Sequence, residues 1–291
     1  MSLPVKMVVA TALGRWIERE GGLVGPIHIS SRGGMRGLFV SEDVKAGTPL
    51  LAVPRHCTLH SDAVADDDAS ALRPHERLML ALLRARAAAA RAPDDGLSLY
   101  VASIPAEIPL LRDWPDGALD ALARQSTAAS ALAAAARAQR GAAARSCARV
   151  VAHAPFADDA DLRWAEAAVR SRALDTSAAG GPRTLQLVPI FDMCNHRPAA
   201  AAADASQRVV ELTSDGVAVL TAPEALRAGD EIAFPYDAGG GNAELLLDYG
   251  FGIGADGAAA TAAPPEDPEA VAAVLESVSY THLTLPTTPY V

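Results

Sequence analysis

The sequence predicts an α+β protein, mainly β, whose small sheets at both ends of the chain bracket a large α-helical insertion. Residues 25–60 and 184–234 carry short apolar runs bounded by glycine and proline, which is typical of strands. Residues 67–175 instead carry apolar residues near helical spacing. A chain of 291 residues is long enough for one sizeable core that holds both parts.

The first β region is predicted by alternation and by turn residues. Ile27 and Ile29 alternate with polar neighbours, and residues 38–40 and 50–53 are short apolar runs. Glycines near residues 33–37 and at Gly47 mark the two turns between these strands.

The helical middle starts at a proline. Pro74 suits a first helical turn, and apolar residues follow it at helical spacing. A second, alanine-rich helix is predicted over residues 118–147 and a third over residues 157–173. Alanine buries little area, so the apolar stripe of the second helix is poorly defined.

The second β region has a strong hairpin signal. The Asp215–Gly216 pair separates two apolar runs and favours a tight turn between them. A short helix follows over residues 242–249. The predicted strands cover residues 185–190, 209–213, 217–220 and 231–234.

Charge and cysteine usage exclude several functions. The formal net charge is −10, which argues against a general nucleic-acid binder. The three cysteines lie far apart without metal-finger spacing, so a reducing compartment and no metal are expected. Apolar runs are too short to cross a bilayer, and the first 12 residues show no convincing signal-peptide cleavage pattern.

The last residues break the compositional pattern. Residues 256–267 are rich in alanine and proline, and a short helix is predicted to follow up to Leu275. Residues 279–291 abandon the alanine bias, so we expect them to be non-native cloning sequence and the natural chain to continue past about residue 278.

Three segments carry candidate functional residues. The first is the glycine-containing stretch at residues 33–39, which suits close approach of a ligand, although such a stretch taken alone is more often a tight hairpin turn. The second is residues 192–196, where a carboxylate, an amide and an imidazole follow a strand. This cluster has too few ligands for a metal site, and His196 alone is also compatible with a structural role.

The third segment places two tyrosines thirteen residues apart. Tyr236 follows a predicted strand, and Tyr249 ends a predicted helix. Each tyrosine taken alone is most often a packed aromatic residue.

The three segments, in this order, resemble the SET-domain protein methyltransferases related to the Rubisco large-subunit lysine methyltransferase. Residues 192–196 match the Asp-x-x-Asn-His box of the family, and residues 242–251 match its Asn-Ala-Glu-Leu-Leu-x-x-Tyr-Gly-Phe signature. Residues 99–105 with Trp114, and residues 170–173, are similar to further family segments.

The resemblance implies a SET fold and a role for each matched residue. The cofactor is expected to be S-adenosylmethionine, with Tyr236 as the catalytic residue. The residues implied to bind the cofactor are Met35, Arg36, Gly37, Arg172, Asn195, His196 and Tyr236. Those implied to line the channel for the substrate are Ser171, Leu174, Asp192 and Tyr249.

The resemblance also implies a knot-like active site and a division of the chain. Residues 1–66 and 181–253 are expected to form the SET domain and residues 67–180 its helical insertion. Residues 254–278 would begin a truncated C-terminal substrate-binding module, followed by the non-native residues 279–291.

The implied function is S-adenosylmethionine-dependent methylation of a protein lysine by a monomer with no nucleic-acid or membrane partner. The location is expected to be intracellular, with cytoplasm, nucleus and plastid all open. Two alternatives stay open as well: methylation of a protein histidine, and an inactive SET-fold module that binds protein. A purely structural alanine-rich protein would make three ordered motifs coincidental.

Overall fold

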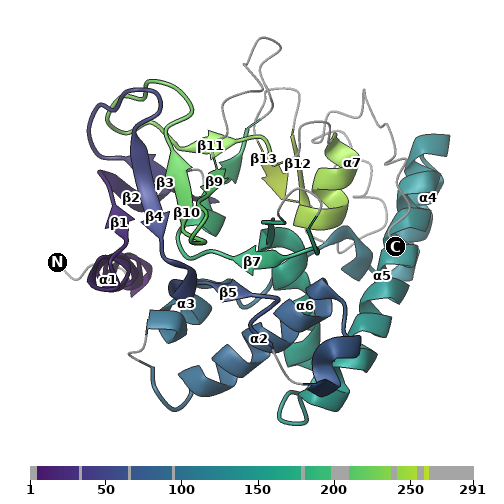
Figure 1. Cartoon of the computed structure of the whole chain (residues 1–291). Helices are drawn as coiled ribbons and strands as arrows, with labels where there is room; N and C mark the ends of the chain where they lie inside the picture. The colour runs from purple at the N-terminus through teal and green to yellow at the C-terminus, as the bar shows by residue number, and fades with distance from the viewer. Residues whose placement is uncertain are drawn as a thin grey trace. The chain divides into compact units, whose positions relative to one another are not determined.

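The computed structural model describes residues 5–32, 35–64, 67–93, 96–177, 181–197, 210–236, 241–253 and 259–261. The chain divides into two compact units, each built from segments distant in the sequence. Figure 1 labels the helices and strands, coloured along the chain. The first unit is Met1–Pro105 with Arg172–Ala238, and the second is Ala106–Ser171 with Gly239–Val291. The domain boundaries expected from the sequence stay predictions.

The first unit contains the predicted N-terminal hairpin. Strand β2 (Ile27–Arg32) pairs antiparallel with β3 (Met35–Val40), with Ile29 opposite Leu38. β3 buries its last four residues, whereas β2 alternates between half-buried and exposed positions. β2 therefore has a half-buried and an exposed face over residues 27–30, as the alternation predicts, whereas the end of β3 is buried on both faces.

A four-stranded antiparallel sheet lies in the same unit. Its order is β1 (Leu23–Val24), β4 (Pro49–Val53), β10 (Ala218–Thr221) and β9 (Val210–Leu212). Gly216 joins β9 to β10 with a φ of 82°, a left-handed conformation that glycine adopts without steric cost. The predicted hairpin at Asp215–Gly216 is confirmed.

The first unit also contains helices, of which the sequence predicts only some. α2 (Pro74–Ala89) begins at Pro74 as predicted and is followed by α3 (Gly96–Ser103). α1 (Val5–Arg19) was not predicted; it contacts α3, where a Cβ on Gly96 would lie 1.9 Å from the Trp16 ring. Glycine at position 96 therefore lets the two helices approach closely.

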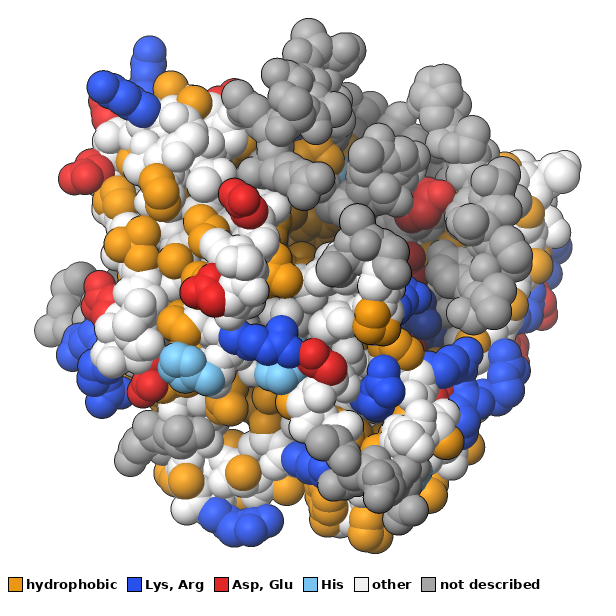
Figure 2. Space-filling model, viewed as in Figure 1, with side chains coloured by type: hydrophobic (Ala, Val, Ile, Leu, Met, Phe, Trp, Pro, Cys, Tyr) orange, Lys and Arg blue, Asp and Glu red, His pale blue; other side chains and the backbone are white. Residues whose placement is uncertain are grey.

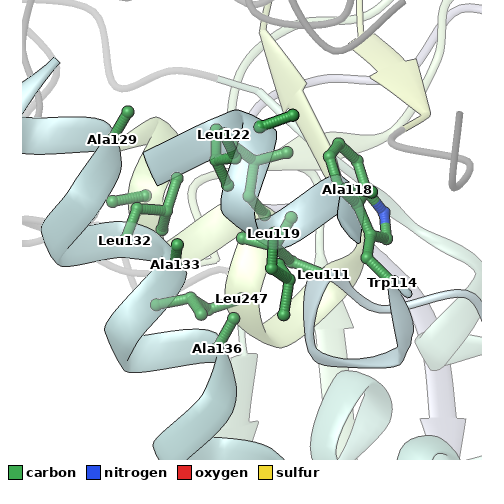
Figure 3. Close-up of a cluster of buried hydrophobic side chains, with 13 residues drawn as sticks. Leu111, Trp114, Ala118, Leu119, Leu122, Ala129, Leu132, Ala133, Ala136 and Leu247 are labelled. Atoms are coloured by element: carbon green, nitrogen blue, oxygen red, sulfur yellow. The ribbon is translucent and has the colours of Figure 1, made fainter. Parts of the chain in front are cut away.

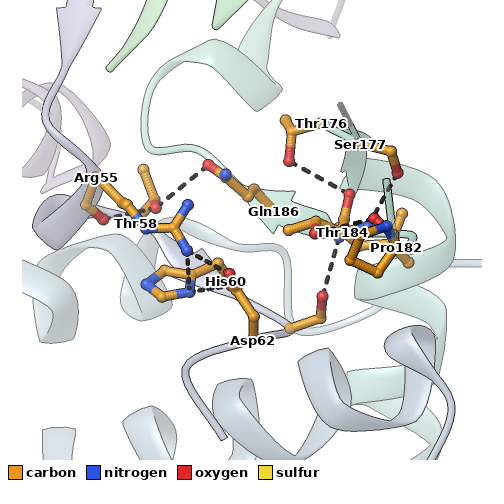
Figure 4. A network of polar contacts seen from close by, with 11 residues as sticks. Arg55, Thr58, His60, Asp62, Thr176, Ser177, Pro182, Thr184 and Gln186 are labelled. Carbon is orange, nitrogen blue, oxygen red and sulfur yellow. Dashed lines mark hydrogen bonds and ion pairs between the residues drawn. The ribbon is translucent and has the colours of Figure 1, made fainter. Parts of the chain in front are cut away.

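A polar network surrounds the three-stranded sheet β5 (Leu59–His60), β7 (Leu185–Leu187) and β6 (Leu174–Asp175) (Figure 4). Asp62 accepts hydrogen bonds from Arg55, at 2.5 Å, and from the ring of His60, at 2.6 Å. These partners lower the pKa of Asp62, against the opposing effect of its burial.

The strand predicted over residues 185–190 is wrong beyond Leu187. Ile190 has a φ of 67°, the only non-glycine residue with positive φ in the described ranges, and it turns the chain into the 3-10 turn η5 (Phe191–Met193). A β-branched residue in this region costs about 1–3 kcal/mol, so the surrounding packing must hold it there. The expected strand over residues 231–234 is likewise shorter, since β11 covers Ala233–Phe234.

The second unit is largely helical. The single helix predicted over residues 118–147 is wrong: α4 (Asp116–Ala123) and α5 (Thr127–Val150) are separate helices. The Ser126 hydroxyl caps α5 by accepting from the Ala129 amide at 3.1 Å, which starts a new helix there. The third predicted helix is confirmed as α6 (Asp159–Arg172), whose residues up to Ser171 belong to this unit.

The core of the second unit is rich in alanine. Figure 3 shows Trp114 and several leucines packed against small alanines of α4 and α5. Small side chains allow helices to approach closely, so alanine serves here as a packing residue. The buried cluster consists of Leu111, Trp114, Ala118, Leu119, Ala121, Leu122, Ala129, Leu132, Ala133, Ala136, Ala243, Leu246 and Leu247.

The helix predicted over residues 242–249 is confirmed in this unit as α7 (Asn242–Glu244) continued by a π-helical turn, η6 (Leu245–Tyr249). β12 (Phe251–Ile253) follows and pairs with β13 (Ala259–Thr261). The helix predicted up to Leu275 and residues 279–291 lie outside the described residues.

Neither a membrane span nor a metal-binding group occurs in the described part of the chain. No helix there is long and apolar enough to cross a bilayer, and no three acidic, histidine or cysteine side chains are grouped to hold a metal. On the face in Figure 2, acidic, basic and hydrophobic side chains are interspersed.

Candidate functional site

Three motif segments that are distant in the sequence meet in the first unit. β8 (Asn195–His196) pairs in parallel with β11, with Asn195 opposite Ala233. The amide of Ile232, next to β11, donates to the Leu38 carbonyl of β3 at 2.7 Å. The parallel pairing therefore brings the Asn-His segment and the tyrosine segment together beside the N-terminal hairpin.

Asn195 lies at the centre of this junction. Its side-chain nitrogen donates to the Arg36 carbonyl at 3.0 Å and to Oε1 of Glu231 at 2.6 Å. A Cβ on Gly37 would lie 2.3 Å from the same Glu231 oxygen. Gly37 is thus required by a close approach of side chains, in addition to any role in the turn.

His196 and Tyr236 form a second contact in this region. The Tyr236 amide donates to Nδ1 of His196 at 3.2 Å, so the proton of the neutral ring is on Nε2. The two rings are in edge contact, with centroids 5.3 Å apart. Burial lowers the pKa of His196, which favours the neutral form.

The hydroxyl of Tyr236 donates to the Cys194 carbonyl at 2.7 Å. Two contacts therefore fix the Tyr236 side chain. Its ring lies against His196, and its hydroxyl is bonded to the backbone carbonyl of Cys194. A fixed hydroxyl suits a residue that orients a reacting group.

Asp192 is the centre of a buried cluster of charged groups. Its side chain is only 2% exposed, and Oδ2 accepts from Arg172 and from the Tyr100 hydroxyl, both at 3.1 Å. Burial, with the nearby Asp192 charge, raises the pKa of Tyr100, so the phenol stays a proton donor. Burial also lowers the pKa of Arg36, whose guanidinium donates to the Ser103 carbonyl at 2.7 Å.

Two atoms of this cluster are buried without a hydrogen bond to the residues that the structure describes: Oδ1 of Asp192 and Nε of Arg172. Buried polar atoms without a partner are costly, because they lose their hydrogen bonds to water. The cluster therefore has one acceptor and one donor to offer to a bound group.

Other expected residues of this unit lie on its strands. Met35 begins β3 opposite Arg32, and Leu174 begins β6 opposite Gln186; both side chains are half-buried. The sequence reasoning did not select Glu231, Tyr100 or Ile190 as site residues. Glu231 is the first residue of the strand predicted over residues 231–234, and an acidic residue at that strand start was the signal that could have indicated it.

Comparisons with known proteins show which chains this sequence resembles. No family model matches the chain. The chain is 24% identical over 251 residues to the chloroplastic Rubisco large-subunit N-methyltransferase of Pisum sativum, covering 81% of this chain and 50% of that protein. It is 33% identical over 94 residues to the chloroplastic fructose-bisphosphate aldolase-lysine N-methyltransferase of Arabidopsis thaliana, covering 31% of this chain and 19% of that protein.

Solved structures decide the fold. The chain superimposes with a TM-score of 0.69 on the SET domain of LSMT bound to methyllysine and AdoHcy, at 25% identity over 86% of this chain and 57% of that one. This chain has the SET fold. A second structure, the SET domain of LSMT bound to lysine and AdoHcy, gives a TM-score of 0.68 at 23% identity over 85% of this chain and 58% of that one.

The predicted SET fold and the likeness to the Rubisco large-subunit methyltransferases are therefore confirmed. The fold class is α+β with small sheets, as predicted. The chain spans about half the length of the Rubisco methyltransferase relatives that it matches.

Two of the expected site residues, Ser171 and Tyr249, lie in the second unit. Ser171 donates its hydroxyl to the Ala167 carbonyl at 2.8 Å, within α6. Tyr249 ends η6, with its ring 6.2 Å from that of Phe251. Asp248, next to Tyr249, accepts from Gln139 at 2.8 Å and from Arg170 at 3.2 Å. The roles of Ser171 and Tyr249 stay predictions.

The turn after Tyr249 requires glycine. Gly250 has a φ of 74°, and a Cβ there would lie 1.9 Å from the Pro109 carbonyl oxygen. We expect Gly250→Ala to lower the free energy of unfolding by about 2–4 kcal/mol, because left-handed strain adds to a backbone clash. Chemical denaturation followed by circular dichroism measures this change.

Gly47 is the matched control for Gly250. Its φ is 75°, but nothing lies within 4 Å of the position of a Cβ. Gly47→Ala should therefore cost only the backbone strain, about 1–2 kcal/mol. Equal losses in the two variants would show that the Pro109 contact does not constrain the turn.

Proposed function

We propose that this chain transfers a methyl group from S-adenosylmethionine to a lysine side chain of a protein. The observation that carries the proposal is the meeting of residues 35–37, the Asn195–His196 pair and Tyr236 in one unit of a SET domain. The names of the relatives support it, since they are N-methyltransferases of Rubisco and of an aldolase lysine. The similar structures are bound to AdoMet, AdoHcy, lysine or methyllysine.

The residues of the first unit fit the proposed cofactor. S-adenosylmethionine carries a carboxylate, an ammonium group and a sulfonium, and so needs both donors and acceptors. Arg172 has a buried donor, Nε, without a hydrogen bond to the described residues, which suits a carboxylate. Asn195 offers its Oδ1 as an acceptor. At Gly37 the backbone of β3 carries no side chain.

We propose that the residues that hold the cofactor are Met35, Arg36, Gly37, Arg172, Asn195, His196 and Tyr236. Those proposed to line the lysine channel are Ser171, Leu174, Asp192 and Tyr249. For Asp192, the bonds from Arg172 and Tyr100 favour a carboxylate that orients its neighbours and acts on the substrate through its remaining oxygen.

S-adenosylmethionine would supply, when bound, a sulfonium methyl group whose carbon a neutral amine would attack in line, with the thioether S-adenosylhomocysteine as the leaving group. The chain must align and desolvate that amine, because little new charge forms. Free lysine has a pKa near 10.4 and is therefore protonated at neutral pH. A poorly hydrated channel must lower the pKa of the substrate lysine so that its amine is neutral. Tyr236, fixed by His196 and the Cys194 carbonyl, is placed to orient the amine through its hydroxyl.

Position 174 bears on which product forms. The family often has an aromatic residue near this position, whereas this chain has Leu174. A less aromatic wall changes the width of the proposed channel, and with it the number of methyl groups added or the side chain accepted. Mass spectrometry of the modified peptide distinguishes mono-, di- and trimethyllysine, and it also detects methylhistidine.

Calorimetric titration of the full 291-residue chain with S-adenosylmethionine tests the proposal, together with methyl transfer from the tritiated cofactor into a protein extract. Saturable one-to-one binding with labelled lysine in the extract is the expected result. Binding without transfer would favour the alternative of a SET-fold binding module, and no binding by a folded chain would overturn the proposal.

Asn195→Ala is expected to weaken the affinity for S-adenosylmethionine about tenfold or more. The variant removes the side-chain acceptor proposed for the cofactor, and a hydrogen bond to a charged group contributes about 1.5–3 kcal/mol. The titration measures the dissociation constant, and circular dichroism confirms the fold. An unchanged dissociation constant would refute the placement of Asn195 at the cofactor.

The partner and location follow from the same proposal. The partner is a protein that presents a lysine, and the chain acts as a monomer without nucleic acid or membrane. The matched relatives are chloroplastic, which favours a plastid among the intracellular compartments.

A further inference from the structure

We propose that Glu231 is a positioning residue that fixes the orientation of the Asn195 carboxamide, so that only its oxygen faces a ligand. The inference rests on the proposed role of Asn195 in cofactor binding and adds a residue to that site. Glu231 lies one residue before Ile232, whose amide pairs with β3, and Glu231 itself bridges to Phe39 of that strand.

The hydrogen bonds of Asn195 carry the argument. A carboxamide nitrogen has two hydrogens, and here one goes to the Arg36 carbonyl at 3.0 Å and the other to the Glu231 carboxylate at 2.6 Å. Both donors of Asn195 are therefore used, while its Oδ1 accepts no hydrogen bond from the described residues. The side chain can offer a ligand an acceptor only.

Glu231 allows only one of the two orientations of the Asn195 amide. An ionised carboxylate accepts hydrogen bonds but cannot donate them, and a backbone carbonyl has the same limit. Rotating the Asn195 amide by half a turn would place its oxygen against both of these oxygens. Repulsion on two sides therefore excludes the rotated form, which would present N–H groups to the ligand.

Gly37 belongs to the same arrangement. The position of a Cβ on Gly37 lies 2.3 Å from Glu231 Oε1 and 3.0 Å from Asn195 Nδ2. A side chain at this position would push the carboxylate away from the amide. The glycine of the first motif, the asparagine of the second and the acidic residue before the third are thus mutually dependent.

A fixed acceptor selects the chemistry of the ligand. Oδ1 of Asn195 can accept from an amino or ammonium group but would repel a carboxylate or a carbonyl. S-adenosylmethionine carries both an ammonium and an amino group, so a locked Asn195 would favour a cofactor of this kind.

A double-mutant cycle tests the inference by titration with S-adenosylmethionine. Glu231→Gln keeps the shape and can accept or donate, so it no longer excludes the rotated amide. We expect it to weaken cofactor affinity about fivefold. In the Asn195→Ala background, the same change should have no further effect on affinity, because its action passes through Asn195.

A loss that persists in the Asn195→Ala background would overturn the inference, since Glu231 would then act directly on the cofactor or on the fold. Glu224→Gln is the matched control. It removes another acidic charge of the same unit, that of the surface ion pair with Arg197, and should leave affinity within twofold.

A second measurement does not need the cofactor. In nuclear magnetic resonance, the two side-chain N–H protons of Asn195 should be protected from solvent exchange, and Asn195→Ala should remove that pair and so assign it. Glu231→Ala is expected to lose the protection of one proton. Unchanged protection would overturn the inference, whereas a protected pair in a chain that does not bind S-adenosylmethionine would overturn only the proposed function.

Discussion

Tyr236→Phe is expected to keep the affinity for S-adenosylmethionine within about twofold and to lower methyl transfer about 10- to 100-fold. The phenylalanine ring preserves the edge contact with His196, whose centroid lies 5.3 Å away. The change removes only the hydroxyl, which donates to the Cys194 carbonyl at 2.7 Å. One hydrogen bond to a charged or reacting group contributes about 1.5–3 kcal/mol, which corresponds to this range of rates.

Calorimetry and the tritium transfer assay must be carried out on the same preparation. Equal transfer rates for the wild type and Tyr236→Phe would contradict the proposed role of the hydroxyl in orienting the amine. A loss of cofactor affinity as large as the loss of transfer would instead show that Tyr236 acts mainly in binding.

Glu166→Ala is expected to lower the free energy of unfolding by about 3–5 kcal/mol. Glu166 forms an ion pair with Arg112, and the two side chains are only 1% and 4% exposed. Removing the carboxylate leaves the buried Arg112 guanidinium with only the half-exposed Asp113 carboxylate, 3.8 Å away, as a charged partner, which costs far more than the loss of an exposed pair. Chemical denaturation gives the change, with circular dichroism as the probe.

Asp120→Ala provides the matched control in the same unit. It removes the exposed ion pair with Arg137, whose two side chains are 37% and 61% exposed, and should cost about 0–1 kcal/mol. Replacing both buried partners, as Arg112→Met with Glu166→Leu, should recover much of the loss because no unpaired charge remains. A Glu166→Ala variant as stable as the Asp120→Ala control would contradict the prediction.

Glu166 also belongs to a wider network in the second unit. It pairs with Arg170 at 3.3 Å, and Arg170 pairs with Asp248 at 3.2 Å. Asp248 lies next to Tyr249 within the π-helical turn η6. These charged side chains thus connect α6 to the turn that carries Tyr249, and loss of Glu166 should loosen that turn as well as the core.

The motifs were accessible from the sequence because their chemistry depends on short runs of residues. The hairpin at Asp215–Gly216 was predicted by the backbone preference of glycine, which is a local property. The Asn195–His196 pair and Tyr236 were identified by their order and spacing, which resemble those of the SET family. Each of these signals depends only on residues close in the sequence, so contacts between distant segments do not change it.

Other features could not be predicted from the sequence, because they depend on contacts between distant segments. Ile190 is held at a positive φ that its own side chain disfavours, so its packing overrides local preference. The break between α4 and α5 lies in an alanine-rich run whose helical signal is nearly uniform, and only the Ser126 cap marks it.

The sequence by itself determined the fold class, the order of the three motifs and the candidate residues within them. It did so because strand alternation, turn glycines and motif spacing are properties of neighbouring residues. Only the tertiary structure decided that Glu231 and the Arg36 carbonyl bind the Asn195 amide, and that Asp192 is tied to Arg172 and Tyr100. Hydrogen bonds between residues so far apart in the chain form only when the strands pair, and no local pattern encodes their partners.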